Sequence, residues 1–200
     1  SEECSYDIHE FSRVVQNYNI DIVKLVPTHF SALLDVCVEE IKLPKKIVFG
    51  GEKLEPALVQ KTKRVSPQSR IFNHYGPTEC TVGSLCGEVL DSKKSISLGT
   101  ALSGYRAVIK SKSGKILPRG SLGELYISGD GVSAGYKRNP IANKQSFFNE
   151  QSQAGLRSYK TGDQVYLATN GEYYFIGRYD DQVKINGYRV ELGEIEAQVK

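Results

Sequence analysis

Short β-branched runs alternate with amphipathic stretches over the first part of the chain, which predicts strands alternating with helices. Strands are expected at residues 20–26, 46–49 and 69–73. Helices are expected between them, one capped by Thr28 and one beginning near Glu55 with Pro56 at an early position. A β-α-β-α-β order favours a parallel sheet, and ligands of such sheets bind beyond the carboxyl ends of the strands.

The pattern changes after about residue 84, where short apolar runs are separated by Gly and Pro turns. Asn170-Gly171 between two such runs is typical of a β-hairpin. We therefore predict antiparallel structure, a small distorted barrel or curled sheet, then a strand at 182–185 and a helix from about Leu192. The predicted class is α/β: a parallel β-α-β half-domain, an antiparallel β subdomain and the start of a small α+β C-terminal domain. The expected boundaries are 1–83, 84–178 and 179–200.

Composition narrows the classes of function. The 200 residues are 40% hydrophobic and 24% charged, which is ordinary for a globular protein, and no run approaches the roughly 20 apolar residues of a membrane helix. Lys and Arg number 26 against 23 Asp and Glu, so neither nucleic acid nor a membrane is expected as a partner. Four cysteines without C-x-x-C spacing argue against zinc or a redox pair and favour reduced thiols. Because the chain begins with Ser1 and has no Met, we expect a processed start or a segment of a longer protein.

Two polar runs invite a functional and a plain structural interpretation. Residues 73–79 follow a predicted strand and combine a Tyr ring for a base, a Thr hydroxyl for a phosphate and a Glu oxygen for Mg²⁺. The plain interpretation of that run is a Gly-Pro turn, and we favour function. The Gly-rich run 128–136 fails the dinucleotide fingerprint, because its third glycine comes one residue late and no helix start follows. We expect a tight turn there.

Two further runs stay open when taken alone. Residues 159–163 form either a loop entering a strand or a place where Asp163 holds a ribose diol. Residues 177–196 carry many charges of both signs, which is typical of a solvated hairpin leading into an acidic helix start.

Taken in order, these runs resemble the motifs of adenylate-forming enzymes, most closely the amino-acid adenylation domains of nonribosomal peptide synthetases. The family's N-x-Y-G-P-T-E, G-E-L-x-I-x-G-x-G-V-x-x-G-Y, Y-K-T-G-D and G-R-x-D-x-Q-V-K-I-x-G-x-R-V-E-L-G-E-I-E runs match residues 73–79, 123–136, 159–163 and 177–196. Departures from the family's usual residues occur at Ser133-Ala134 and at Asn186.

The resemblance implies an ATP-dependent ligase. A carboxylate attacks the α-phosphate of ATP, with Mg²⁺ as cofactor, and the aminoacyl group passes to a phosphopantetheine thiol on a peptidyl carrier protein. Neighbouring synthetase domains are the other implied partners, and a cytoplasmic location is expected. The alternatives are an acyl- or aryl-CoA ligase of the same superfamily, or a non-catalytic, interrupted adenylation fragment with a scaffold role.

The resemblance also implies roles for individual residues. Tyr75 would stack on adenine, Asp163 would hold the ribose and Arg178 would reach the ribose-phosphate region. Asp180 would be the hinge of the small domain. The implied catalytic residues are Thr78, Glu79 and Lys184, with Glu79 also the Mg²⁺ ligand. The implied nucleotide-binding residues are Gly51, Glu52, Asn73, Tyr75, Gly76, Thr78, Asp163, Phe175 and Arg178.

A substrate pocket is implied at positions scattered between the motifs. Its residues are Lys24, Val48, Gly50, His74, Val82 and Gly83. A Lys at the end of a buried strand would need an anionic partner, so L-aspartate or a β-substituted relative is expected. The alternative is that Lys24 reaches solvent and the pocket is generic. The family's phosphate loop is expected upstream of Ser1 and its catalytic lysine beyond Lys200, so residues 1–200 alone are expected to be inactive.

Overall fold

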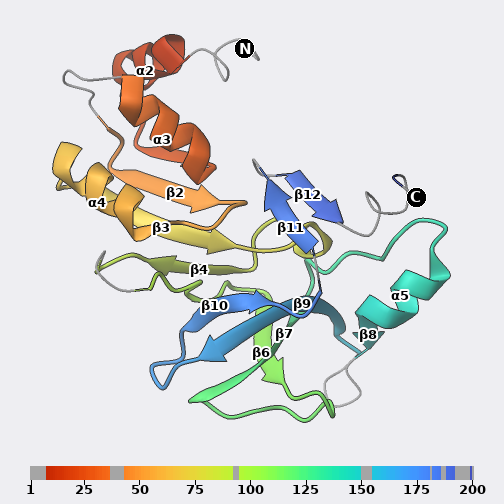
Figure 1. Ribbon diagram of the computed structural model, residues 1–200. Helices are drawn as coiled ribbons and strands as arrows, with labels where there is room; N and C mark the ends of the chain where they lie inside the picture. The colour runs from red at the N-terminus through yellow and green to blue at the C-terminus, as the bar shows by residue number, and fades with distance from the viewer. Residues whose placement is uncertain are drawn as a thin grey trace. The chain divides into compact units, whose positions relative to one another are not determined.

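The computed structural model of the chain describes residues 8–36, 43–91, 95–149, 155–180, 182–185, 188–191 and 199 (Figure 1). The elements of the first part are α2 (Ile8–Asn17), β1 (Ile22–Leu25), α3 (Pro27–Val36), β2 (Lys46–Gly50), α4 (Pro56–Val65), β3 (Arg70–Tyr75), the 3₁₀ turn η1 (Thr78–Cys80) and β4 (Leu85–Glu88). The later elements are β5 (Thr100–Ala101), β6 (Tyr105–Lys110), β7 (Ser121–Gly129), α5 (Pro140–Ser146), β8 (Phe147–Asn149), β9 (Arg157–Leu167), β10 (Tyr173–Arg178), β11 (Gln182–Ile185) and β12 (Tyr188–Glu191). They fall into two compact units: residues 1–73 with 88–96, and residues 74–87 with 97–200.

The first unit contains the predicted alternation of strands and helices. β1 and β2 pair in parallel, and Figure 1 draws β2 and β3 pointing the same way. The core of this unit is built from side chains of the strands and of α3 and α4 that are at most 1% exposed: Phe30, Ile47, Phe49, Val59 and Ile71. The rings of Phe30 and Phe49 meet edge to face, with centroids 5.2 Å apart. Burial of one face of each strand therefore sets the register of this sheet.

The start of α3 differs from the prediction that Thr28 caps it. The helix begins at Pro27, so Thr28 lies inside its first turn. The carboxylate of Glu52 instead accepts hydrogen bonds from the Thr28 backbone N–H at 3.0 Å and from its hydroxyl at 2.9 Å. A carboxylate at this end satisfies a free N–H and favours the helix dipole. The cap was missed because it comes from 24 residues away in the sequence.

The second unit contains the antiparallel structure that the sequence predicts. Its main sheet has the order β10-β9-β7-β6, with β8 also paired to β9. The hairpin between β9 and β10 turns at Gly171, which has φ +89°, as the Asn-Gly signal predicts. The hydrophobic core side chains of this unit at 0% exposure are Cys80, Leu85, Ile109, Leu125, Ile127 and Val165.

The expected barrel is wrong, because this sheet is open. β6 and β10 are the two ends of the strand order, and among the described residues they do not pair to close a ring. β11 and β12 form a separate two-stranded antiparallel sheet. The helix expected from about Leu192 lies outside the described residues except for Val199. The boundaries 1–83, 84–178 and 179–200 stay a prediction.

Two further observations concern membrane-spanning helices and the cysteine thiols. Across the described ranges, no helix combines the length and apolar character that crossing a bilayer requires. Cys80 is a free thiol, whereas Cys4 and Cys37 lie outside the described residues.

Candidate active site

The carboxyl end of β1 holds Lys24, the cation expected in the substrate pocket. Lys24 is the register partner of Val48 on β2, so these two pocket candidates are neighbours on one sheet face. Val23, Ile47 and Phe49 take the opposite, buried face. Lys24 is exposed. The side-chain alternation of the strand turns Lys24 away from the core, and its charge stays in water at no desolvation cost.

The turn after β3 brings three other predicted residues together. A Cβ on Gly83 would overlap the imidazole of His74, so only glycine leaves room for that ring. A Cβ on Gly76 would lie 2.7 Å from the Gly83 Cα, so the two backbones also need glycine to approach. Between them, Thr81 and Val82 have φ of 55° and 67°, a conformation that costs a β-branched residue energy. The Thr81 hydroxyl holds this turn by donating to the Gly131 carbonyl at 2.7 Å.

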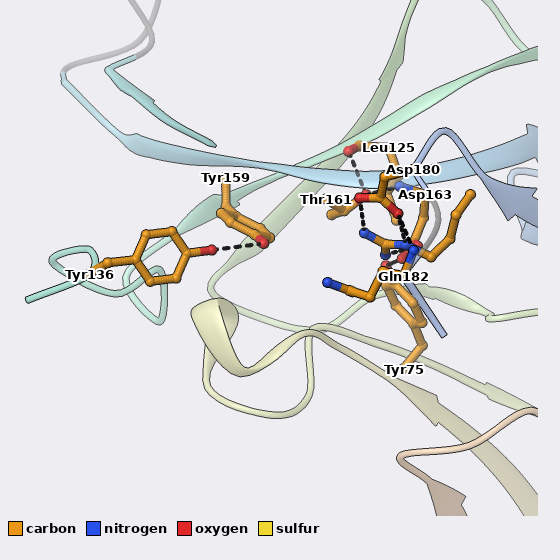
Figure 2. A network of polar contacts seen from close by, with 9 residues as sticks. Tyr75, Leu125, Tyr136, Tyr159, Thr161, Asp163, Asp180 and Gln182 are labelled. Atoms are coloured by element: carbon orange, nitrogen blue, oxygen red, sulfur yellow. Dashed lines mark hydrogen bonds and ion pairs between the residues drawn. The ribbon is translucent and has the colours of Figure 1, made fainter. Parts of the chain in front are cut away.

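A cluster of charged and phenolic groups forms between the end of β3, the middle of β9 and the end of β10 (Figure 2). The Tyr75 hydroxyl donates to Asp163 Oδ2, and Arg178 Nη1 donates to Asp163 Oδ1 at 2.5 Å. Arg178 also donates through Nε and Nη2 to the two oxygens of Asp180, at 2.5 and 2.7 Å. The side chains of Asp163 and Arg178 are 8% and 18% exposed, whereas that of Asp180 is 49% exposed. The structure therefore links Tyr75 to Asp163, and Asp163 to the predicted hinge residue Asp180 through the guanidinium of Arg178.

The backbone around Asp163 fixes the position of its carboxylate. The Thr161 hydroxyl donates to the Leu125 carbonyl at 2.9 Å and accepts the Asp163 N–H at 3.0 Å. Gly162 has φ +75°, and a Cβ there would lie 2.8 Å from Arg178 Nη2. Thr161 and Gly162 thus orient the carboxylate and leave space for the guanidinium.

The pKa values in this cluster reflect burial and the two carboxylates. Burial raises the pKa of the Tyr75 phenol well above its usual value, and the negative charge of Asp163 adds to the rise. Burial by itself lowers the pKa of Arg178, but the hydrogen bonds and charges of Asp180 and Asp163 outweigh it and raise the net pKa. Tyr75 therefore stays a neutral hydrogen-bond donor and Arg178 a permanent cation.

Glu79 lies in η1 and is only 5% exposed. Its Oε1 accepts a hydrogen bond of 2.5 Å from the Tyr136 hydroxyl, and its carbonyl accepts one of 2.8 Å from the Ser133 N–H. Burial raises the pKa of the adjacent Cys80 to about 12, with the charge of Glu79 adding to it. Cys80 is therefore a thiol, not a nucleophilic thiolate, at neutral pH.

The structure places the remaining predicted residues as follows. Thr78 is exposed at the start of η1, and Asn73 is 7% exposed at the end of β3. Phe175 is half-buried against the core of the second unit. Gly51 follows β2 with φ +87°, which glycine adopts readily, and Gly50 is buried. Lys184 belongs to β11, but its side chain lies outside what the structure describes.

Sequence reasoning assigned no role to Tyr136 and Thr161. Tyr136 lies inside the matched run 123–136 and Thr161 inside the run 159–163, and this position within a motif could have marked each as a functional residue. Their partners Glu79 and Leu125 are 57 and 36 residues away, so a local pattern could not reveal the contacts.

The chemistry of the site residues fits Mg²⁺. Mg²⁺ in phosphate-transfer sites is held by one or two carboxylates plus substrate phosphates and water. Glu79 supplies one such carboxylate, and its surroundings fix its orientation. Within the part of the chain that the structure describes, no group of three or more His, Cys, Asp and Glu side chains forms an all-protein metal cage. This donor set suits a metal that arrives with a nucleotide.

Comparison of the sequence with known proteins gives a family match. A sequence profile described as AMP-binding enzyme matches residues 1–137. Bacitracin synthase 3 of Bacillus licheniformis is 37% identical over 191 residues, which make up 94% of this chain and 3% of that protein. Tyrocidine synthase 3 of Brevibacillus parabrevis is 39% identical over 175 residues, which make up 87% of this chain and 3% of that protein. The chain thus spans only a small part of the length of these curated relatives.

Solved structures agree with this match. The chain superimposes on holo-PA1221, an NRPS protein containing adenylation and PCP domains bound to a vinylsulfonamide inhibitor, with TM-score 0.89 and 28% identity over 96% of this chain and 34% of that one. It superimposes on the Vibrio cholerae adenylation domain AlmE, in complex with glycyl-adenosine-5'-phosphate, with TM-score 0.81 and 29% identity over 94% of this chain and 37% of that one. The predicted resemblance and the α/β class are confirmed.

Proposed function

Because the chain belongs to the AMP-binding enzyme family, we propose that it forms part of an amino-acid adenylation domain of a nonribosomal peptide synthetase. In the proposed reaction an amino-acid carboxylate attacks the α-phosphate of ATP, forming aminoacyl-AMP and releasing pyrophosphate. The phosphopantetheine thiol of a peptidyl carrier protein then attacks the aminoacyl carbonyl, forming a thioester and releasing AMP. The synthase and adenylation-domain relatives described above support both steps.

The cluster of Tyr75, Asp163 and Arg178 is the observation that carries this proposal. Its members come from three separate motif runs, with Tyr75 and Asp163 88 residues apart, yet they are joined by hydrogen bonds (Figure 2). A flat ring, a fixed carboxylate and a guanidinium provide the groups needed to bind an adenine, a ribose diol and a phosphate. Preorganisation of charge in this way is the main contribution of protein to phosphoryl-type transfer.

Each group has a proposed task. The Tyr75 ring stacks on adenine, Asp163 accepts hydrogen bonds from the ribose hydroxyls, and Arg178 neutralises charge near the phosphate. Glu79 would hold Mg²⁺, which when bound neutralises phosphate charge as pyrophosphate leaves. Thr78 is exposed at the start of η1, where its hydroxyl can donate to a phosphate. Asp180 and Lys184 serve the hinge and the second half-reaction.

For the substrate, we propose L-aspartate or a β-substituted aspartate. The support is the charge of Lys24 beside Val48 on one strand face, together with an imidazole at His74 packed against Gly83. Because Lys24 is exposed, we expect it to attract the substrate carboxylate through a charge-assisted hydrogen bond. The substrate does not have to compensate the desolvation of a buried ammonium.

Amino-acid-dependent exchange of pyrophosphate into ATP tests the proposal on the full-length protein. All proteinogenic amino acids and a set of aryl and fatty acids are offered singly, followed by transfer to a carrier protein or to free coenzyme A. We expect exchange with aspartate and thioester formation on the carrier protein. Exchange with aryl or fatty acids and transfer to coenzyme A would favour the CoA-ligase alternative, and no exchange with any acid would favour the scaffold alternative.

A further inference from the structure

We propose that Tyr136 is a positioning residue for Glu79, an inference that rests on the proposed function of Glu79 as the Mg²⁺ ligand. The Gly-rich run 128–136 has no other role in the proposed reaction. Its last residue places a phenolic hydroxyl 2.5 Å from Glu79 Oε1, across 57 residues of sequence. The run therefore does more than form the tight turn expected from its glycines.

The position of Tyr136 is set by side chains on two later elements. Asn143 of α5 accepts the Tyr136 N–H at 2.6 Å and donates to the Tyr136 carbonyl at 2.8 Å, so it holds the backbone on both sides of the ring. Arg157 of β9 donates to the carbonyls of Ser133 and Ala134, each at 2.8 Å. These four hydrogen bonds fix the end of the run.

The ring and hydroxyl of Tyr136 are held as well. The ring meets Phe147 edge to face, with centroids 5.4 Å apart, and Phe147 packs on Tyr159 at 5.1 Å. The Tyr159 hydroxyl lies 3.4 Å from the Tyr136 hydroxyl. Figure 2 draws this contact as a dashed line between the two side chains. The phenol that faces Glu79 is therefore fixed in direction as well as in place.

The same run also holds the backbone of the turn that carries Glu79. The Ser133 N–H donates to the Glu79 carbonyl at 2.8 Å, and Gly131 accepts the Thr81 hydroxyl at 2.7 Å. Among these three contacts of the run, the Tyr136 hydroxyl is the one that bonds the Glu79 carboxylate. Backbone contacts therefore set the position of Glu79, and the Tyr136 phenol sets the orientation of its carboxylate.

A fixed carboxylate matters because Mg²⁺ demands near-ideal octahedral geometry. Glu79 is 5% exposed, and a buried carboxylate is stabilised in its charged form by a donor such as the Tyr136 hydroxyl. With Oε1 held by the phenol, the rotation of the carboxylate and the direction of Oε2 are defined. Removal of a group that orients a metal ligand typically lowers the affinity for the metal by about 10–100-fold.

Tyr136→Phe tests the inference in the full-length protein, because it removes the hydroxyl and keeps the ring packing. The matched control is Tyr105→Phe, whose lost hydroxyl donates at 2.9 Å to the carbonyl of Cys80 in the same turn but does not bond the Glu79 carboxylate. Two quantities are measured: the Mg²⁺ concentration that half-saturates pyrophosphate exchange, and the binding of Mn²⁺ with a non-hydrolysable ATP analogue by electron paramagnetic resonance. Thermal unfolding is followed in parallel.

We expect Tyr136→Phe to weaken both metal measurements by about 10–100-fold, and Tyr105→Phe to change them by less than about 3-fold at a similar unfolding temperature. In a Glu79→Gln background, Tyr136→Phe should have little further effect. Equal shifts in the two Phe variants, or none in Tyr136→Phe, would overturn the inference. If the wild-type protein shows no exchange, the proposed function fails, and Mn²⁺ binding still decides the role of Tyr136. Absence of Mn²⁺ binding by wild type would overturn both.

Discussion

Arg178 and Asp163 are register partners on β10 and β9, and their side chains form an ion pair with Nη1 and Oδ1 2.5 Å apart. The same guanidinium makes two hydrogen bonds to Asp180 two residues later. The proposed ribose ligand and the proposed hinge residue therefore share one cation. Asp163 is buried and Asp180 is half exposed, so we expect the ion pair of Arg178 with Asp163 to contribute more to stability than its ion pair with Asp180.

The first prediction compares the contributions of the Asp163 and Asp180 ion pairs to the free energy of unfolding. Asp163→Ala should cost on the order of 3–5 kcal/mol, because it leaves the largely buried Arg178 without that carboxylate. Asp180→Ala should cost about 0–1 kcal/mol, because solvent screens an exposed pair. Urea denaturation of the three proteins measures both values. An equal loss of unfolding free energy in the two variants would show that burial does not determine how much each ion pair stabilises the protein.

The second prediction concerns the nucleotide. Asp163→Asn keeps the shape of the side chain and removes its charge, so hydrogen bonds to the ribose weaken. A hydrogen bond to a charged group contributes about 1.5–3 kcal/mol, which corresponds to at least about a tenfold loss of ATP affinity. Calorimetric titration of the full-length protein with ATP measures it. Asp130→Asn, an exposed carboxylate in the Gly-rich run, is the control and should leave the affinity unchanged. Unaltered binding by Asp163→Asn would remove this residue from the site.

The third prediction concerns the packing of His74 on Gly83. Gly83→Ala should destabilise the protein by about 1–3 kcal/mol, because the new methyl group overlaps the imidazole. In a His74→Ala background the same methyl group has room, so its cost should fall below about 0.5 kcal/mol. Thermal or urea unfolding of the two single variants and the double variant gives the coupling. Additive costs would contradict the contact.

The fourth prediction concerns the substrate. Lys24→Ala should lower kcat/KM for aspartate by about 10–150-fold, the equivalent of one charge-assisted hydrogen bond. Turnover of alanine or valine should change by less than about 3-fold, because these side chains carry no charge. Lys46→Ala, another exposed lysine of the same sheet, is the control. Pyrophosphate exchange with each amino acid provides the rates. If aspartate turnover survives Lys24→Ala, the aspartate proposal fails while the adenylation proposal stands.

The fifth prediction concerns alkaline pH. Burial raises the pKa of Tyr126 to about 12, and it also raises the pKa of Tyr75 and Tyr173. Phenols titrate near pH 10 in the unfolded chain, so the folded state keeps these protons longer. Their contribution to stability is complete below about pH 10 and is lost as the pH rises toward the folded pKa.

Urea unfolding at several pH values from 8 to 11 tests this. The free energy of unfolding of the wild type should fall above about pH 10, and Tyr126→Phe should make that fall less steep. Tyr18→Phe, which changes a tyrosine that is 76% exposed, should keep the wild-type slope. A wild-type stability that stays constant or rises from pH 10 to 11 would contradict the prediction.

Much of the fold could be predicted from the sequence, because strand and helix periodicity and turn residues are local. The alternation of 20–26, 46–49 and 69–73 with helices, and the hairpin at Asn170-Gly171, needed no knowledge of distant contacts. The barrel was wrong because closure depends on which strands meet at the ends of the sheet order. That order arises from pairings between distant segments, such as β7 with β9.

The sequence by itself determined the four motif runs and hence the family, since those depend only on residue types and spacing. Tertiary structure alone decided that Tyr136 meets Glu79 and that Asp163 bonds both Tyr75 and Arg178. It also decided that Lys24 is exposed. The physical reason is that a hydrogen bond requires two atoms within about 3 Å. Strand register and the placement of the core set such distances, and neither is expressed in a run of a few residues.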